Sequence, residues 1–382
     1  MIQTDAASAK PNASPRQRVG ERRRLRLQAR LTWRDAGGAL RVGPKSAGAQ
    51  PGPACYGRGG RESTVTDANV VLGRIDPASF LGGEIRLDGD AARRAIHDGI
   101  AKPLGLTVEA AAEGIIRVIN ATMVRGMRAV SVEKGYDPRE FALVAFGGGG
   151  PLHAADLARE LGAQNVVIPI MPGVTSALGL LVADLRYDVS ATVRRSLASP
   201  DLGALSTVYA DLEAQALEQM ARDGVDHGAV QLHRSADIRY ARQSWELEIT
   251  VPPGVLDPTA VALVGSEFHA RHAQQYGYAM EGEELILVNA QVSAIAELPK
   301  PPLGLAGMAS GGYRSGGPAT QRRTWLGAAW VPAVVHQRGD LSPGATIEGP
   351  AIVEQLDTTT FLGRGDVARV DGFGNLIVTV AP

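Results

Sequence analysis

The chain has 382 residues, of which 45% are hydrophobic, and this length and apolar content are sufficient for two or three packed domains. Its formal net charge of −1 gives no global reason to expect nucleic acid or an anionic membrane as a partner, and its single cysteine excludes an internal disulfide or a cysteine metal cluster. Because the sequence has neither the h-region of a signal peptide nor an apolar run as long as a membrane span, we expect a soluble cytoplasmic protein.

A basic segment follows the polar, turn-rich start of the chain. Eight arginines lie between Arg16 and Arg34. Such a run can form an arm for nucleic acid, but aromatic residues are not interleaved with these arginines. A disordered, solvated tail is therefore the preferred interpretation of residues 1–35.

A loop rich in glycine and proline and a helix start come next. Cys55 lies in the loop Pro51–Gly60, with no histidine base close in sequence, so we predict a small buried filler and not a nucleophile. Asp67 lies in the segment Thr64–Asn69 at a predicted loop-to-helix boundary. Its carboxylate is a candidate for a catalytic or metal-binding role, and the alternative that we favour is capping of a helix that begins near Ala68.

Two helices are predicted after this boundary, over about residues 89–104 and 108–133. Apolar residues in the second helix recur at spacings of three and four, which indicates that one face packs on a core. These residues are Ala112, Ile116, Ile119, Met123, Met127 and Val130.

The most informative stretch of the sequence is a strand, a glycine loop and a helix. Residues 141–146 are mostly apolar and predict a short buried strand, which runs into four glycines at 147–150. Pro151 then begins a helix that ends before Gly162. Glycines allow a ligand to approach main-chain N–H groups, and a helix N-terminus favours negative charge, so this geometry suits a nucleotide. The spacing matches neither known phosphate-loop fingerprint, and a tight turn packed on a neighbour is the alternative.

A histidine and a second strand follow the glycine loop. His153 could contact a phosphate or act as an acid or base, or its ring could simply bond a backbone carbonyl. Asn165–Ile170 predicts the next buried strand, and a turn and a helix come after it. Two successive strand-then-helix units predict an α/β arrangement with partly parallel strands.

The last half of the chain combines a helix, paired strands, a linker and a β-rich tail. His269 and His272 could share one helix face, but no third ligand is evident, so a metal site is not favoured. Residues 299–319 have the proline and glycine content of a linker. The tail predicts short strands, and the acidic residues Glu354 and Asp357 form no recognisable catalytic group.

One segment resembles a known family. The run SVEKGYDPREFALVAFGGGGPLHAADLARELG closely resembles the A subunit of the ATP-dependent hydantoinase, oxoprolinase and acetone/acetophenone carboxylase family. The resemblance extends from about Trp33 to the C-terminus and includes Gly349–Glu354 and Asp357–Thr360. Two positions depart from the family pattern: Gly149 replaces an alanine, and Arg242 replaces a glycine. If the glycine is needed there for a positive φ or a close approach, Arg242 would strain the backbone.

The resemblance implies a fold and a site. It implies an α/β lobe of an actin-like, sugar-kinase-like ATPase fold, followed by a mixed α+β region and a β-rich C-terminal domain. His153 and Asp67 are its candidate catalytic residues, and Asp67 is also the candidate metal ligand. ATP and Mg²⁺ are the implied cofactors. The adenosine-side loop that it implies consists of Gly147, Gly148, Gly149, Gly150 and Pro151.

The resemblance also implies an activity and partners. The family activity is ATP-dependent hydrolysis of cyclic amides such as hydantoin and 5-oxoproline, or ATP-dependent ketone carboxylation, completed by a B-type subunit. Family members are close to twice as long, and their D-x-G-G-T phosphate turns do not occur here. We therefore expect that activity needs a separate N-terminal lobe. The alternative is a catalytically inactive fragment or a subunit-docking protein.

The comparison also suggests an origin for the basic segment and a division of the chain. Arg16–Thr32 could be an out-of-frame reading of the glycine-rich segment that family members carry there. The expected division is a disordered or out-of-frame segment at 1–35, a glycine-loop lobe at 36–190, a mixed region at 191–298, a linker at 299–319 and a β-rich domain at 320–382.

Overall fold

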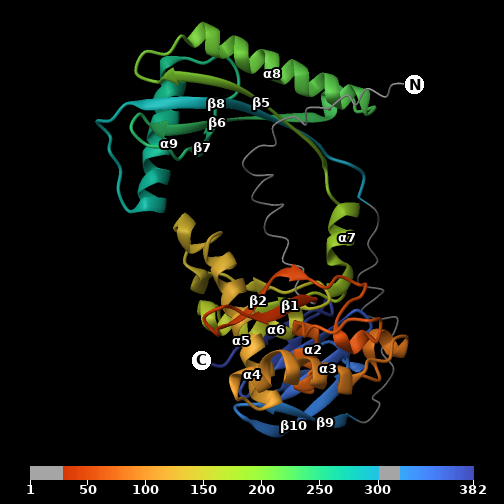
Figure 1. Ribbon diagram of the computed structural model, residues 1–382. Helices are drawn as coiled ribbons and strands as arrows, with labels where there is room; N and C mark the ends of the chain where they lie inside the picture. Colours follow the sequence, from red (N-terminus) through yellow and green to blue (C-terminus); the bar gives the residue numbers. More distant parts are fainter. Residues whose placement is uncertain (1–28, 301–318) are drawn as a thin grey trace, which may run out of the picture. The chain divides into compact units, whose positions relative to one another are not determined.

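The computed structural model describes residues 29–300 and 319–382. The chain divides into two compact units (Figure 1). Unit 1 comprises Met1–Ser131, Asp137–Ser176 and Gly304–Pro382, and unit 2 comprises Val132–Tyr136 and Ala177–Leu303. The C-terminal tail thus belongs to the same unit as the glycine loop, whereas the sequence-based division gave it a domain of its own.

The helices of unit 1 agree closely with the sequence pattern. α3 (Gly89–Ile96) continues through a π-turn at His97–Ala101 into α4 (Lys102–Leu104), as the predicted helix over 89–104 requires. α5 (Val108–Arg128) buries Ala112, Ile116, Ile119 and Met123, but it ends before Val130, which is exposed. The other helices of this unit are α2 (Val65–Val71) and α6 (Gly150–Leu161).

The described residues of unit 1 form three sheets. A two-stranded sheet pairs β1 with β2, a four-stranded sheet has the order β13-β12-β10-β9, and a five-stranded sheet has the order β11-β14-β15-β4-β3. The strands are β1 (Arg30–Arg34), β2 (Leu40–Ser46), β3 (Leu143–Val144), β4 (Asn165–Ile168), β9 (Thr320–Leu326), β10 (Ala329–Gln337), β11 (Thr346–Glu348), β12 (Ala351–Gln355), β13 (Thr358–Leu362), β14 (Val367–Val370) and β15 (Leu376–Thr379).

The five-stranded sheet joins the tail to the glycine-loop lobe. β3 and β4 are parallel, which confirms the predicted partly parallel arrangement. β15 pairs with β4 antiparallel, with Leu376 opposite Ile168. The strands expected to form a separate β-rich domain therefore complete a sheet begun by residues 143–168.

α6 lies between the two hydrophobic cores of unit 1. Leu152 and Leu157 belong to the core formed with α2, α3 and α5, and Ala154 and Ala158 belong to the core formed with the five-stranded sheet. One face of α6 thus carries large side chains, Leu152 and Leu157, and another carries the small side chains of Ala154 and Ala158. This double burial fixes the position of the glycine loop from which α6 starts.

Two local predictions are wrong. The strand predicted over residues 141–146 is reduced to Leu143–Val144, and the side chains of Val144 and Phe146 are 51% and 48% exposed. β3 is the edge strand of its sheet in the described part of the chain, so its outer face is not covered. Arg30–Arg34, expected within the disordered segment, form β1, which pairs with β2. The remainder of the predicted basic segment, residues 1–28, lies outside the described residues.

Unit 2 is a four-stranded antiparallel sheet with two long helices. Its strands have the order β5-β8-β6-β7 and comprise Leu185–Ser196, Leu285–Ala296, Val230–Tyr240 and Leu247–Val251 respectively. Alternate residues of β6 are buried, and they share one core with α8 (Leu202–Arg222) and α9 (Pro258–Tyr276). This one-sided alternation is typical of a sheet whose helices cover one face. The predicted helix and paired strands are confirmed, and α7 (Thr175–Leu181) connects the units (Figure 1).

His269, His272 and Arg242 lie in unit 2, and both histidine rings are within hydrogen-bonding distance of neighbouring residues. His272 is buried between the carbonyl oxygen of Tyr278 and the side chain of Gln243, and Nδ1 of His269 lies 2.8 Å from the Tyr240 hydroxyl. The backbone of Arg242 does not have a positive φ, so the strain considered for a replaced glycine does not arise. None of the described helices is both long and apolar enough to cross a membrane.

Candidate functional site

The glycine loop is a sharp connection from β3 to α6. Gly147 has a φ of 79°, which favours glycine, and its N–H donates to the carbonyl of Pro172 at 2.7 Å. Gly149 is the N-cap residue, no side chain caps the helix, and Pro151 lies in the first turn. The N–H groups at this helix start are therefore available to a ligand.

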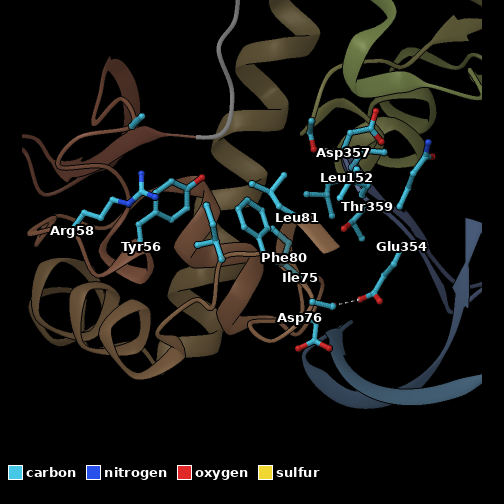
Figure 2. Close-up of a pocket in the computed structure, with 17 residues that line it drawn as sticks. Tyr56, Arg58, Ile75, Asp76, Phe80, Leu81, Leu152, Glu354, Asp357 and Thr359 are labelled. Atoms are coloured by element: carbon cyan, nitrogen blue, oxygen red, sulfur yellow. Dashed lines mark hydrogen bonds between the residues drawn. The ribbon is translucent and has the colours of Figure 1, made fainter. Parts of the chain in front are cut away.

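A cavity of about 280 Å³ opens beside the loop. This volume is near the lower end of the range of about 300–1,000 Å³ that is usual for small-molecule sites. Gly148 and Leu152 line it from the loop and α6, and Figure 2 shows Tyr56 and Arg58 on one side of Phe80 and Leu81, with Asp357 on the other. Every lining residue belongs to unit 1. The cavity thus combines apolar and aromatic walls with a small number of charged groups.

One wall of the cavity is an ion-pair network. Nη2 of Arg322 donates to Glu354 at 2.6 Å and to Asp76 at 3.0 Å. The second carboxylate oxygen of Glu354 accepts from Gln337 at 2.8 Å, and Ser79 donates to the first at 3.3 Å. Because Glu354 is nearly fully buried, these bonds offset the cost of removing its charge from water. The network joins the loop after α2 to β9, β10 and β12 and makes this wall rigid.

Next to this network lies the turn between β12 and β13, which meets the glycine loop directly. The Thr358 hydroxyl donates to the carbonyl oxygen of Gly148 at 3.1 Å. The neighbouring Asp357 accepts from the N–H of Gly173 at 2.8 Å, and its other carboxylate oxygen is buried without a hydrogen-bond partner in the described structure. Sequence reasoning noted Asp357 but did not place it at the site. The only available signal was that the segment Asp357–Thr360 and the glycine loop both resembled the same family.

His153 lies beside the loop but faces the interior. It is 2% exposed, and its Nδ1 is 2.8 Å from Oδ1 of Asn120 on α5. Burial, reinforced by the positive charge of Arg74, lowers the pKa of His153 to about 3. The imidazole is therefore neutral at physiological pH, which does not suit a general base that must take up a proton near neutrality. Its catalytic role stays a prediction.

Asp67 is buried at the start of α2 and its carboxylate is fully engaged. It forms a capping box with Thr64, whose N–H and hydroxyl donate to it at 2.8 and 2.7 Å. The N–H of Cys55 donates to the other oxygen at 2.8 Å. The helix begins at Val65, three residues earlier than predicted. These contacts favour the capping interpretation, since they leave little capacity for a metal ion or a substrate.

The surroundings of Cys55 do not favour a reactive thiol. Burial and the nearby Asp67 raise the pKa of the Cys55 thiol, so the reactive thiolate form is disfavoured and the predicted filler role fits. Within residues 29–300 and 319–382, no three His, Cys, Asp or Glu side chains form a group that could hold a metal ion.

Two family models match almost all of this chain. The hydantoinase/oxoprolinase model matches residues 28–189, and the hydantoinase/oxoprolinase C-terminal domain model matches residues 197–377. The chain belongs to the hydantoinase/oxoprolinase family. This confirms the resemblance seen in the sequence.

Relatives of this hydantoinase/oxoprolinase family chain include subunits of larger enzymes. It is 38% identical to the caprolactamase subunit alpha of Pseudomonas jessenii over 336 residues, which are 86% of this chain and 48% of the relative. It is 30% identical to the acetone carboxylase beta subunit of Xanthobacter autotrophicus over 346 residues, which are 87% of this chain and 48% of the relative. The chain thus spans about half the length of the curated relatives that it matches.

A solved structure supports the fold. The crystal structure of the ATP-dependent caprolactamase from Pseudomonas jessenii matches with a TM-score of 0.77 and 34% identity, over 93% of this chain and 52% of that chain. The family chain described here therefore has a mixed α/β fold with several sheets, like that relative.

Proposed function

We propose that this chain is an A-type subunit of an ATP-dependent enzyme of the hydantoinase/oxoprolinase family, and that the cavity beside Gly148 holds the adenosine part of the nucleotide. The position of the glycine loop carries the proposal. Gly148 lines the cavity, and α6, whose start no side chain caps, begins two residues later and contributes Leu152 to the lining. Apolar and aromatic walls with a few polar groups are usual for small-molecule sites.

The described residues fit a nucleoside and do not fit Mg²⁺. A cavity of about 280 Å³ with one engaged acidic wall offers no cluster of carboxylates for a cation. We therefore assign the phosphate and metal contacts to the half of the relatives that this chain does not span. In this proposal the chain is one lobe of an actin-like ATPase fold.

The proposed reaction is activation of a carbonyl compound by ATP. Phosphorylation of the carbonyl oxygen turns a cyclic amide into a better electrophile for hydrolysis. In the carboxylase variant, phosphorylation of the ketone oxygen with loss of an α-proton gives an enol phosphate, whose α-carbon is the nucleophile for carboxylation, and a B-type subunit completes either reaction. Phosphoryl transfer depends mainly on positioning and on neutralising charge, so a lobe that only positions the nucleoside still contributes to it. Two matched relatives are named as subunits, and one solved relative is described as ATP-dependent, which supports this assignment.

Calorimetric titration of the chain with ATP and ADP, in the presence of Mg²⁺, tests the proposal. We expect binding in the micromolar range, lost in Gly148→Asp because a carboxylate would then face the ligand inside the cavity. Gly372→Asp is the matched control. Gly372 lies in the same unit, has an ordinary φ and has open space around it, and it does not line the cavity.

The two outcomes separate the two functions. Binding to the unchanged chain and to Gly372→Asp, but not to Gly148→Asp, supports a working adenosine half-site. Absence of binding by the unchanged chain would overturn the proposal and favour a catalytically inactive, subunit-docking protein. The thermal unfolding of each variant is measured in parallel, so that loss of binding is separated from loss of folding.

A further inference from the structure

Three arginines line a cleft that is separate from the proposed nucleoside site. The cleft has a volume of about 690 Å³ and lies among β1, the loop over residues 60–63 and α3. Arg34, Arg61 and Arg94 come from these three segments respectively. Every residue that lines the cleft belongs to unit 1, and none of them also lines the cavity beside Gly148. We call this feature the arginine cleft.

The backbone brings two of these arginines to the same level. β1 meets the loop that follows Gly60 in an antiparallel bridge between Leu31 and Thr64. The same register, continued along both segments, places Arg34 opposite Arg61. Like charges at opposite positions of two antiparallel segments repel each other. An anion that binds between the two segments would remove this repulsion.

The three positive charges are poorly compensated within the protein. Arg61 has no hydrogen-bond or ion-pair partner among the described residues. Arg94 lies 3.7 Å from Asp88 and its side chain is 67% exposed, so this ion pair contributes little. The Arg34 guanidinium donates to the uncharged carbonyl oxygen of Pro103 at 3.4 Å. Because a guanidinium is always charged and can donate two parallel hydrogen bonds to a carboxylate, these side chains suit an anionic ligand.

The rest of the lining favours a peptide over a nucleic acid. Glu62 and Asp98 also line the cleft, and they would repel the closely spaced phosphates of a nucleic acid, whereas a peptide can place uncharged residues opposite them. Trp33 is the one aromatic residue among the described residues of the lining, so bases have little to stack on. α3 contributes Ala91 and Ala95, one turn apart, whose small side chains allow a chain segment to lie close to the helix.

The sequence before β1 adds to the positive charge. Eight arginines lie between Arg16 and Arg34, and the last of them lines the cleft. The net charge of −1 for the whole chain therefore conceals a local concentration of positive charge. Basic runs of this kind are typical of chains that bind an anionic partner.

We propose that the arginine cleft binds an acidic segment of a partner protein, whose carboxylates pair with Arg34, Arg61 and Arg94. This inference goes beyond the proposed function and does not depend on it, because the two sites share no lining residue. Ion pairs at an exposed surface guide association and are screened by salt. Binding of the acidic segment should therefore weaken steeply as the salt concentration rises.

Fluorescence anisotropy of a labelled octaglutamate peptide, titrated with the full chain at low salt, tests the inference. We expect binding to weaken about 10-fold or more in the double variant Arg61→Glu, Arg94→Glu, because two attractions become repulsions. Arg61→Gln with Arg94→Gln should weaken binding by a smaller factor. The thermal unfolding of each variant is measured in parallel, and the glutamine variant carries the test if the charge reversal impairs folding.

The matched control is Arg222→Glu with Arg271→Glu. Both arginines are exposed on helices of unit 2, and this variant changes the net charge by the same amount as the charge reversal in the cleft. It should bind octaglutamate as the unchanged chain does.

Four results would overturn the inference. The first is failure of the unchanged chain to bind octaglutamate. The second is equal weakening in the cleft variant and in the unit 2 control, which means that only net charge matters. Loss of binding in Arg22→Gln, Arg23→Gln, Arg24→Gln, without loss in the cleft variants, assigns the binding to the sequence before β1. Tighter binding of octathymidylate than of octaglutamate, weakened by the same cleft variants, assigns the cleft to nucleic acid.

Discussion

Nδ1 of His153 lies 2.8 Å from Oδ1 of Asn120, in a contact between α6 and α5 where both side chains are buried. An amide oxygen only accepts, so Nδ1 of the neutral ring donates this bond. Burial, together with the smaller effect of the positive charge of Arg74, lowers the pKa of His153 to about 3. The histidine that follows the glycine loop thus stabilises helix packing in its neutral form.

Acidification should destabilise unit 1 through His153. The unfolded chain takes up a proton at this residue below a pKa of about 6.5, whereas the folded chain does not until about pH 3. Its contribution to stability is therefore complete above pH 6.5 and is lost as the pH falls. Between pH 7 and pH 5 the loss should be about 2 kcal/mol. Urea unfolding at both pH values measures it, with His153→Gln as the reference that lacks this titration.

A Trp245→Phe background makes that measurement specific. Trp245 belongs to unit 2, whereas the other three tryptophans, Trp33, Trp325 and Trp330, belong to unit 1. Fluorescence then reports unfolding of unit 1. The same pH dependence in the presence and absence of the histidine would contradict the prediction.

Asp67→Ala should destabilise unit 1 by about 3 kcal/mol or more. The carboxylate of Asp67 accepts three short hydrogen bonds from Thr64 and Cys55. Each hydrogen bond to a charged group contributes about 1.5–3 kcal/mol to stability. Asp67→Asn should have a smaller effect. The structural role also predicts that Mg²⁺ does not shift the unfolding temperature of the chain through this residue. A Mg²⁺-dependent increase that disappears in Asp67→Asn would establish the metal-binding alternative.

Gly349→Ala should be strongly destabilising. A Cβ at Gly349 would lie 1.8 Å from the carbonyl oxygen of Gly363, so the backbone of one chain segment would have to move. Overpacking of this kind costs typically about 1–3 kcal/mol, and we expect the upper end of that range. Gly372→Ala is the control, because nothing lies within 4 Å of its added Cβ. Equal unfolding temperatures for the two variants would show that the close approach has no energetic effect.

Two glutamates of α8, each paired with an arginine, should differ sharply in their contribution to unit 2. Glu213 accepts from buried Arg234 at 2.6 and 2.9 Å, whereas Glu218 pairs with exposed Arg222 at 2.7 Å. Glu213→Ala leaves a guanidinium buried without its carboxylate and should cost about 3–5 kcal/mol. Glu218→Ala should cost less than about 1 kcal/mol. Hydrogen exchange of the β6 amides, followed by mass spectrometry, compares the two variants, and similar exchange in both would refute the distinction.

Local signals made the helices predictable from the sequence. Pro151 and Gly162 mark the two ends of α6, and the spacing of Ile116, Ile119 and Met123 marks the buried face of α5. The same local reasoning was wrong for residues 141–146. It treated an apolar run as buried on both sides, whereas only Ala145 and Leu143 of this run face the cores and Val144 and Phe146 do not.

The candidate site was only half predictable. The glycine loop has a composition that indicates close approach of a ligand, and the sequence placed it correctly at the start of a helix. The wall formed by Asp357 and Thr358 could not be placed, because its neighbour Gly148 lies 210 positions away in the sequence. Such a contact depends on the packing of β13 against α6, which no local pattern specifies.

The pairing of Ile168 with Leu376 also has a consequence for synthesis of the chain. β4 leaves the ribosome with only the two-residue β3 of its sheet, and its antiparallel neighbour is made more than 200 residues later. At roughly 5–20 residues per second this interval lasts about 10 to 40 s. Unit 2 can fold during that time, while the apolar strand of unit 1 remains without its neighbour. The nascent chain should therefore depend on chaperone binding at residues 165–168 until its last strands are made.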